Sequence, residues 1–186
     1  MGLTMDIIAK IKAYKPYNAQ EVRDKEQILH LMAKNADIFT RENDRAHMTA
    51  SAWVVNAARD KVLMVYHNIY DSWSWLGGHA DGEEDLLSVA LREVREESGL
   101  TKVRAVSEEI YSLEILTVGE HRKNGKCVEE HLHLNLTYLI EADEEEPLHI
   151  KEDENSGVRW FTVEEALRAS SEPWMVENVY KKLARI

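Results

Sequence analysis

The apolar positions in the middle of the chain repeat with a helical period. Gly99 follows the repeat at the place where a left-handed cap ends a helix. The pattern therefore predicts a helix over about residues 84 to 98. Its buried stripe follows the spacing i, i+3, i+4 and i+7 and consists of Leu87, Ala90, Leu91 and Val94.

Two shorter helical patterns precede this segment. The first contains Ile7, Ile8, Ile11 and Tyr14 and ends at Pro16, which cannot continue a helix. The second covers about residues 19 to 36. We expect residues 1–45 to form a helical extension packed on the flank of the domain. A homodimer contact or part of a substrate lid is the alternative role.

From Ala46 the pattern changes to that of strands. The segment HMTASAWVV, the turn-like NAARD and the segment KVLMVYH predict a hairpin. A second two-residue turn is predicted at Asn124-Gly125. The strand that follows it alternates, which predicts a buried face and a solvated polar face. The apolar face carries Leu132, Leu134, Leu136 and Tyr138, and the polar face carries His131, His133, Asn135 and Thr137.

The last part of the chain returns to helices. An acidic, turn-rich segment predicts a loop, and GVRWF predicts a short strand after it. Thr162 and Glu165 have the spacing of a capping box. A final helix is predicted from about Pro173 to Ala184, with Trp174 among its packing residues. Mixed strands with a central helix and terminal helices predict one α/β sandwich domain over residues 46–186.

Composition narrows the class of partner. The chain has 186 residues, 44% of them apolar, and a net charge of −11. An acidic surface repels a phosphate backbone, so long nucleic acid is excluded as the main partner, whereas a small phosphorylated substrate is compatible with bound metal ions. Cys127 is the only cysteine, which fits a reducing cytoplasm. No apolar run reaches 18 residues and the start lacks a signal-peptide core, so we expect a cytoplasmic protein without membrane contact.

Three glutamates share one side of the central helix. On a helical wheel Glu93, Glu96 and Glu97 fall within an arc of about 100° beside the apolar stripe. Like charges at these spacings destabilise an isolated helix slightly. One interpretation is a solvated face on which Arg92 and Arg95 balance the charge. The other is a site for a hard divalent cation such as Mg²⁺, which prefers oxygen ligands.

The order of these residues decides between the two interpretations. Gly78, five residues, Glu84, seven residues and then REVREESGL, from Arg92 to Leu100, resembles the complete Nudix box. Every fixed position of that signature matches, although Leu76 stands where many members have proline before the two glycines. The resemblance covers 23 of the 186 residues. It implies a Nudix-type α/β/α sandwich, with a mixed sheet and a loop-helix-loop formed by the box.

The resemblance also implies a reaction and a set of roles. Nudix hydrolases cleave a phosphoanhydride bond in a nucleoside diphosphate linked to another group, with Mg²⁺ or Mn²⁺ as cofactor. By matching positions, Glu93, Glu96, Glu97 and the carbonyl oxygen of Gly78 are the expected metal ligands. Arg92 would hold a glutamate in place, and Glu84 would cap or brace the loop.

The box does not fix the general base. Family members place it on the box helix, where Glu96 is the candidate, or in a distal loop. Glu154 lies six residues before Trp160, similar to the distal base of some members that act on nucleoside triphosphates. We take Glu154 as the first candidate. Behind it stand Glu152, Asp153 and Glu130.

Substrate contacts are expected from the residues around the box. His79 follows the box glycine directly, and Trp75 has either a packing role or a stacking role on a substrate ring. His131 and His133 point the same way on a strand, which is compatible with a metal site. Because the box already supplies oxygen ligands for Mg²⁺, we expect both histidines to contact substrate instead.

The identity of the substrate is open at this stage. Residues 115–118 carry neither the proline typical of ADP-ribose hydrolases nor the tyrosine typical of dinucleoside polyphosphate hydrolases. A nucleoside triphosphate or related nucleotide is therefore the default. Two alternatives remain: an enzyme like isopentenyl diphosphate isomerase, which needs a catalytic cysteine, and a non-catalytic nucleotide sensor on the same fold.

Overall fold

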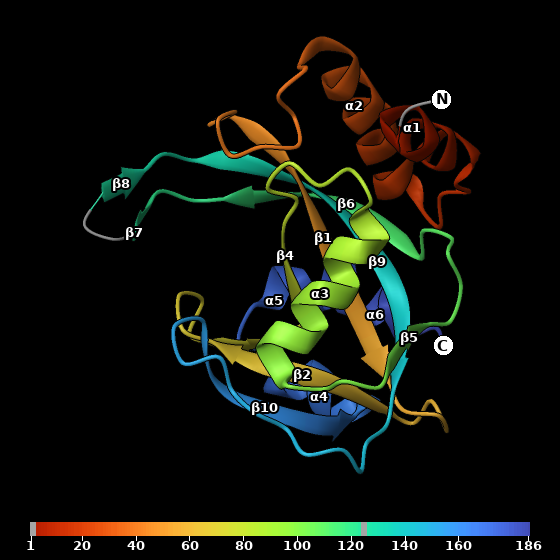
Figure 1. Cartoon of the computed structure of the whole chain (residues 1–186), viewed down its shortest axis with the longest axis vertical. Coiled ribbons are helices and arrows are strands. Elements are labelled where there is room, and N and C mark those ends of the chain that lie inside the picture. The colour runs from red at the N-terminus through yellow and green to blue at the C-terminus, as the bar shows by residue number, and fades with distance from the viewer. Residues whose placement is uncertain (1–2, 124–125) are drawn as a thin grey trace.

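The computed structural model describes residues 3–123 and 126–186, so the predicted Asn124-Gly125 turn lies outside the described residues. Two N-terminal helices precede the strands, the third helix lies between the fourth and fifth strands, and the remaining helices follow the last strand (Figure 1). The helices are α1 (Leu3–Ala13), α2 (Ala19–Lys34), α3 (Leu86–Ser98), α4 (Val163–Ala169), α5 (Pro173–Met175), a π-helical turn (Val176–Tyr180) and α6 (Lys181–Leu183). The strands are β1 (Ala46–Val55), β2 (Lys61–His67), β3 (Ser72–Ser74), β4 (Leu76–His79), β5 (Val103–Ala105), β6 (Ser112–Val118), β7 (His121–Lys123), β8 (Lys126–Val128), β9 (His131–Ala142) and β10 (Asn155–Thr162).

A mixed sheet forms the centre of the molecule. Its strand order is β10-β2-β1-β9-β5, with β3 paired to β2, β4 to β1 and β6 to β9. The long β1–β9 pair is parallel and the other pairs are antiparallel. The predicted hairpin of β1 and β2 forms, but the two strands pair only at Val54 and Val55. The earlier residues Thr49 to Ala52 pair instead with β4, and β1 pairs with β9 along its whole length.

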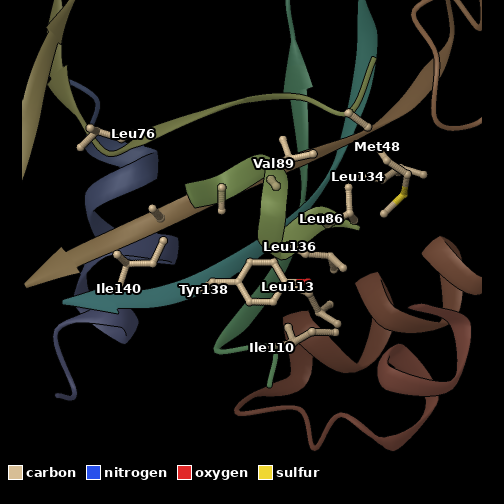
Figure 2. Packing of buried hydrophobic residues seen from close by; sticks show 14 of the residues in the cluster. Met48, Leu76, Leu86, Val89, Ile110, Leu113, Leu134, Leu136, Tyr138 and Ile140 are labelled. Carbon is tan, nitrogen blue, oxygen red and sulfur yellow. The ribbon is translucent and has the colours of Figure 1, made fainter. Parts of the chain in front are cut away.

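Helices cover both faces of this sheet, as the sequence predicted (Figure 1). On one face α3 packs on β1 and β9, and Figure 2 shows Leu86 and Val89 of this helix beside Met48 and Leu134. The opposite face carries a second core, in which the C-terminal helical segment packs on β1 and β2. That core includes Trp53, Val55, Val62, Met64, Val179, Tyr180 and Leu183.

The N-terminal helices are joined to the sheet by apolar and ionic contacts. Ile7, Ile11 and Ile28 are buried in the same core as α3. The ammonium group of Lys182 lies 2.9 Å from a carboxylate oxygen of Glu21 in α2 and 2.9 Å from one of Glu114 in β6. The side chain of Lys182 is only 4% exposed and both carboxylates are fully buried. The domain boundary placed at residue 45 stays a prediction.

The predicted helix caps are confirmed in part, and one predicted packing residue is exposed. Gly99 caps α3 in the left-handed conformation at φ 75°, and the Thr162 capping box is present. The predicted start of the central helix at Glu84 is two residues too early. The Asp85 carboxylate accepts a hydrogen bond from the Ser88 amide, and α3 begins at Leu86. Trp174, expected to pack, is 51% exposed.

The predicted solvated face of β9 is also wrong. Asn135 and Thr137 are buried, because β1 and β6 flank β9 and place further polar side chains around these two residues. None of the helices in the described part of the chain is both long and apolar enough to cross a membrane.

Candidate active site

Two glycines on β4 lie directly against the carboxylates of α3. The Gly77 amide donates a hydrogen bond of 2.9 Å to Oε2 of Glu97. A Cβ atom placed on Gly78 would lie 2.5 Å from the carboxyl carbon of Glu93. Such a distance is shorter than any van der Waals contact, so only glycine allows Glu93 to pack against this strand. The paired glycines therefore set how closely α3 and its carboxylates approach β4.

The three box glutamates differ in exposure. Glu93 and Glu97 are buried, with Glu97 only 2% exposed, whereas Glu96 is partly open to solvent. The interpretation of a solvated charged face is therefore wrong for Glu93 and Glu97. Arg92 lies 3.0 Å from Glu93 and 3.8 Å from Glu96, and it donates a 3.4 Å bond to the carbonyl oxygen of His79. Arg95 is instead bonded to the carbonyl oxygen of Leu91.

Burial makes this cluster unfavourable when every carboxylate is ionised. Burial raises the pKa of Glu93, and the neighbouring Arg92 guanidinium only partly offsets this effect. Burial raises the pKa of Glu97 to about 8, with further contributions from the charges of Glu93 and Glu154, although the Gly77 amide opposes the shift. A hard divalent cation would relieve this repulsion, and the donor set consists of oxygen atoms that suit Mg²⁺ or Mn²⁺. The residues present therefore fit such an ion.

The loop before β10 brings a second acidic element to the same place. Lys151 lies 3.0 Å from a carboxylate oxygen of Glu96 and 3.1 Å from one of Glu154. The side chain of Asn155, which is fully buried, donates a 3.0 Å bond to the backbone carbonyl of Glu97. These contacts fasten the loop to the C-terminal end of α3, so that Glu154 lies beside the box glutamates.

The paired glycines, the box glutamates, Arg92, Lys151 and Glu154 line one cleft with a volume of about 1950 Å³. Each site residue predicted from the sequence lines it: Gly78, His79, Trp75, Arg92, Glu93, Glu96, Glu97, His131, His133 and Glu154. Among the weaker candidates for the base, Asp153 lines the cleft and neither Glu152 nor Glu130 does so. Glu84 is not part of the lining either, and its role in capping or bracing the loop stays a prediction, since the side chain that caps α3 is that of Asp85.

Sequence reasoning missed three residues of this cleft. His47 on β1 is in register with His133 on β9, and burial lowers its pKa, which favours the neutral ring. Lys151 bridges two carboxylates, and Trp174 exposes its ring beside the cleft. The alternation of His47, Thr49 and Ser51 along β1 was the available signal for His47. Nothing in the sequence places Lys151 beside Glu96.

The fold and the carboxylate cluster together define a pyrophosphohydrolase. A model of the NUDIX domain family matches residues 45–183, most of the chain, and the chain therefore belongs to this family. Hydrolases of this family generally use divalent metal ions. The comparison with curated proteins gave no match.

Solved structures of other proteins share the fold. An Ap4A hydrolase of C. elegans is 20% identical, with a TM-score of 0.54 over 74% of this chain and 94% of that chain. A NUDIX family hydrolase of Clostridium perfringens is 20% identical, with a TM-score of 0.51 over 74% and 95%. The dihydroneopterin triphosphate pyrophosphohydrolase of E. coli is 15% identical, with a TM-score of 0.52 over 74% and 94%.

Proposed function

We propose that this protein hydrolyses a phosphoanhydride bond in a nucleoside triphosphate or a related nucleotide, with Mg²⁺ or Mn²⁺ as cofactor. The observation that supports this proposal is the convergence of four carboxylates in one cleft. Glu93, Glu96 and Glu97 come from α3, and Glu154 comes from a loop more than fifty residues further along the chain. A surface helix with a solvated acidic face has no need of the fourth group.

The box residues would hold the cation. Glu93, Glu96 and Glu97 supply carboxylate oxygens, and Gly78 supplies its carbonyl oxygen. When bound, the ion neutralises the charge of the diphosphate and acidifies a coordinated water. Arg92 keeps Glu93 in place through its 3.0 Å contact, because a guanidinium can hold a carboxylate in a fixed direction.

Glu154 would act as the general base that removes a proton from the attacking water. Lys151 fixes its direction, since the ammonium group contacts Glu154 at 3.1 Å and Glu96 at 3.0 Å. Glu96, on the box helix, is the second candidate for the base. Most of the acceleration would come from positioning and charge neutralisation, because phosphoryl transfer needs little covalent participation by the protein.

The remaining cleft residues would contact the rest of the substrate. Trp75 offers a partly exposed ring for stacking on a base. His79, His131 and His133 would contact the substrate either directly or through a bound ion. With an acidic protein the substrate would be small and metal-bound rather than a long nucleic acid. A homodimer and a cytoplasmic location remain expectations from the sequence.

The test is turnover of a panel of nucleoside di- and triphosphate derivatives with Mg²⁺, scored for phosphate, diphosphate and nucleoside monophosphate. Glu154→Gln should lower kcat by roughly 10²-fold or more and leave metal affinity nearly unchanged, as expected for loss of a base. Glu152→Gln is the matched control, because Glu152 lies two residues away and outside the cleft lining. Equal activity of the two variants would remove Glu154 from the mechanism.

Adding isopentenyl diphosphate to the same panel, and measuring binding as well as turnover, separates the two alternative functions. An isomerase would interconvert isopentenyl diphosphates without releasing phosphate, and it would depend on Cys127. This cysteine is exposed, and a hydrogen bond to Glu120 raises the pKa of its thiol, which keeps the thiol protonated at neutral pH. A nucleotide sensor would bind a member of the panel and turn none of them over.

A further inference from the structure

Four histidines meet in the lining of the cleft. His47 comes from β1, His79 from β4, and His131 and His133 from β9. The ring centre of His47 lies 5.1 Å from that of His79 and 5.0 Å from those of His131 and His133. The rings of His79 and His133 lie 4.9 Å apart. Strand pairing brings them together, since His47 is opposite His133 and Thr49 is opposite His79. The metal ion proposed for the carboxylate cluster takes oxygen ligands and needs none of these rings.

We propose that His47, His79 and His133 bind a transition-metal ion of the Zn²⁺ class, at a site separate from the carboxylate cluster. One ring nitrogen from each of the three lies within 4.8 Å of the others. Two nitrogens on one tetrahedral zinc ion are about 3.3 Å apart, given Zn–N bonds of about 2.0–2.1 Å. His79 and His133 are only partly buried, so their side chains can adjust to bring the nitrogens to that separation.

The orientation of His47 is the second observation for this site. Its Nδ1 atom lies 2.9 Å from the backbone carbonyl of Asn43, which assigns the proton to Nδ1 and leaves a lone pair on Nε2. The residue is 4% exposed, and Nε2 has no hydrogen-bond partner among the residues that the structure describes. A buried nitrogen acceptor without a partner is unfavourable, and a metal ion would satisfy it. A carbonyl that holds the distal nitrogen is also the usual support of a metal-bound histidine.

His131 completes the surroundings of the site. Its Nδ1 atom lies 2.8 Å from the carbonyl of Glu129, and its Nε2 atom lies 3.1 Å from Nε2 of His133. His131 lies outside the group of three whose nitrogens converge, so the fourth position of the ion would go to water or a substrate oxygen, as in zinc sites that keep one position open.

The donor set decides the class of ion. Imidazole nitrogen suits Zn²⁺, Cu²⁺, Ni²⁺ and Fe²⁺, whereas Mg²⁺ prefers oxygen ligands. Binding an anion through charged rings is the competing role. It is disfavoured because more than one imidazolium here would place like charges about 5 Å apart, with His47 buried.

The test measures Zn²⁺ affinity of metal-free protein by competition with a chromogenic chelator, in Mg²⁺ excess so that the carboxylates are occupied. Wild-type protein should bind one equivalent of Zn²⁺. His79→Asn and His133→Asn should each bind it at least tenfold more weakly. His30→Ala is the control, because His30 is an exposed histidine on α2. Thermal unfolding verifies that each variant folds, and Zn²⁺ should raise the Tm of the wild type and of His30→Ala but not of His79→Asn or His133→Asn.

Glu97→Gln separates this proposal from the proposed hydrolase. It should impair turnover and leave Zn²⁺ affinity in Mg²⁺ excess unchanged. Absence of tight Zn²⁺ binding by the wild type, or equal binding by His79→Asn, His133→Asn and His30→Ala, would overturn the histidine site. An inactive protein that still binds Zn²⁺ through these residues would overturn only the hydrolase.

Discussion

Replacement of Lys182 by methionine tests the buried ion cluster beneath the sheet. Lys182 contacts Glu21 and Glu114 at 2.9 Å each, and all three side chains are buried. Methionine has a similar length and removes only the charge. Glu21 keeps the Tyr14 hydroxyl and the Tyr17 amide as donors, and the Ser112 hydroxyl contacts both carboxylates. Two buried carboxylates would then share a site with no cation.

The size of the effect follows from the proton needed to relieve that repulsion. One of the two carboxyl groups must be protonated, and its ordinary pKa is 4.5. At pH 7 this costs about 3.4 kcal/mol, from roughly 2.5 pH units at about 1.36 kcal/mol each. The value agrees with the 3–5 kcal/mol or so lost when one partner of a buried ion pair is removed. At pH 5 the same step costs only about 0.7 kcal/mol.

Urea unfolding at pH 7 and pH 5 measures both values. The Tm at pH 7 should fall by about 7–14 °C, since about 1 kcal/mol shifts the Tm of a domain this size by about 2–4 °C. Lys181→Met is the matched control, because Lys181 pairs with Glu177 at the surface and should contribute less than about 1 kcal/mol. A loss below about 1 kcal/mol at pH 7, or an equal loss at both pH values, would refute this reasoning.

Three other predictions concern the active site. Gly78→Ala should lower kcat/KM by about 10²-fold with the fold intact, because a Cβ at 2.5 Å displaces the Glu93 carboxylate by about 1 Å. The control is Gly119→Ala, where a Cβ meets nothing within 4 Å and steady-state rates should not change. Equal rates for the two variants would contradict the packing argument. Asn155→Ala should reduce the free energy of unfolding by about 1–3 kcal/mol in a urea titration, because the Glu97 carbonyl loses its donor, and a loss under about 0.5 kcal/mol would count against that role. In the presence of a chelator, and at pH values between the ordinary pKa of 4.5 and the folded pKa of about 8, Glu97 binds more protons in the folded protein than in the unfolded chain. The free energy of unfolding of the wild type should therefore fall with rising pH relative to Glu97→Gln, by at most about 1.4 kcal/mol per pH unit. His47, whose pKa is lowered, acts in the opposite direction, but equally in both proteins. Excess Mg²⁺ should remove the difference in pH dependence between the two proteins. Identical pH profiles without metal would show that the pKa of Glu97 is not raised.

Signals that act over a few residues could be predicted from the sequence. The burial of Ala90 and Val94 in the predicted stripe, the left-handed cap at Gly99 and the Thr162 capping box depend on contacts within one or two helical turns. Leu87 and Leu91 of the same stripe are only partly buried, and the helix buries Leu86 and Val89 instead. The box carboxylates were also identified, because their spacing on one helix is itself the signal. The start of α3 was misplaced by two residues, since Asp85 and Glu84 are both acidic and only the backbone geometry selects the cap.

Contacts between distant strands could not be predicted. The parallel pairing of β1 with β9 joins residues about 86 apart in sequence and buries the face of β9 that alternation predicts to be solvated. Periodicity identifies which side chains share a face but not what covers that face. The same pairing brings His47 to His133, which is why one histidine of the cleft was missed.

The ion cluster has a consequence for the order in which the protein is assembled. A ribosome produces Glu21 first, Glu114 later and Lys182 last, because translation proceeds from the N-terminus. Until α6 has been synthesised, two acidic groups destined for the interior lack their counter-ion, and closing the structure around them is unfavourable. We therefore expect the nascent chain to stay open on that side until its final helix leaves the exit tunnel.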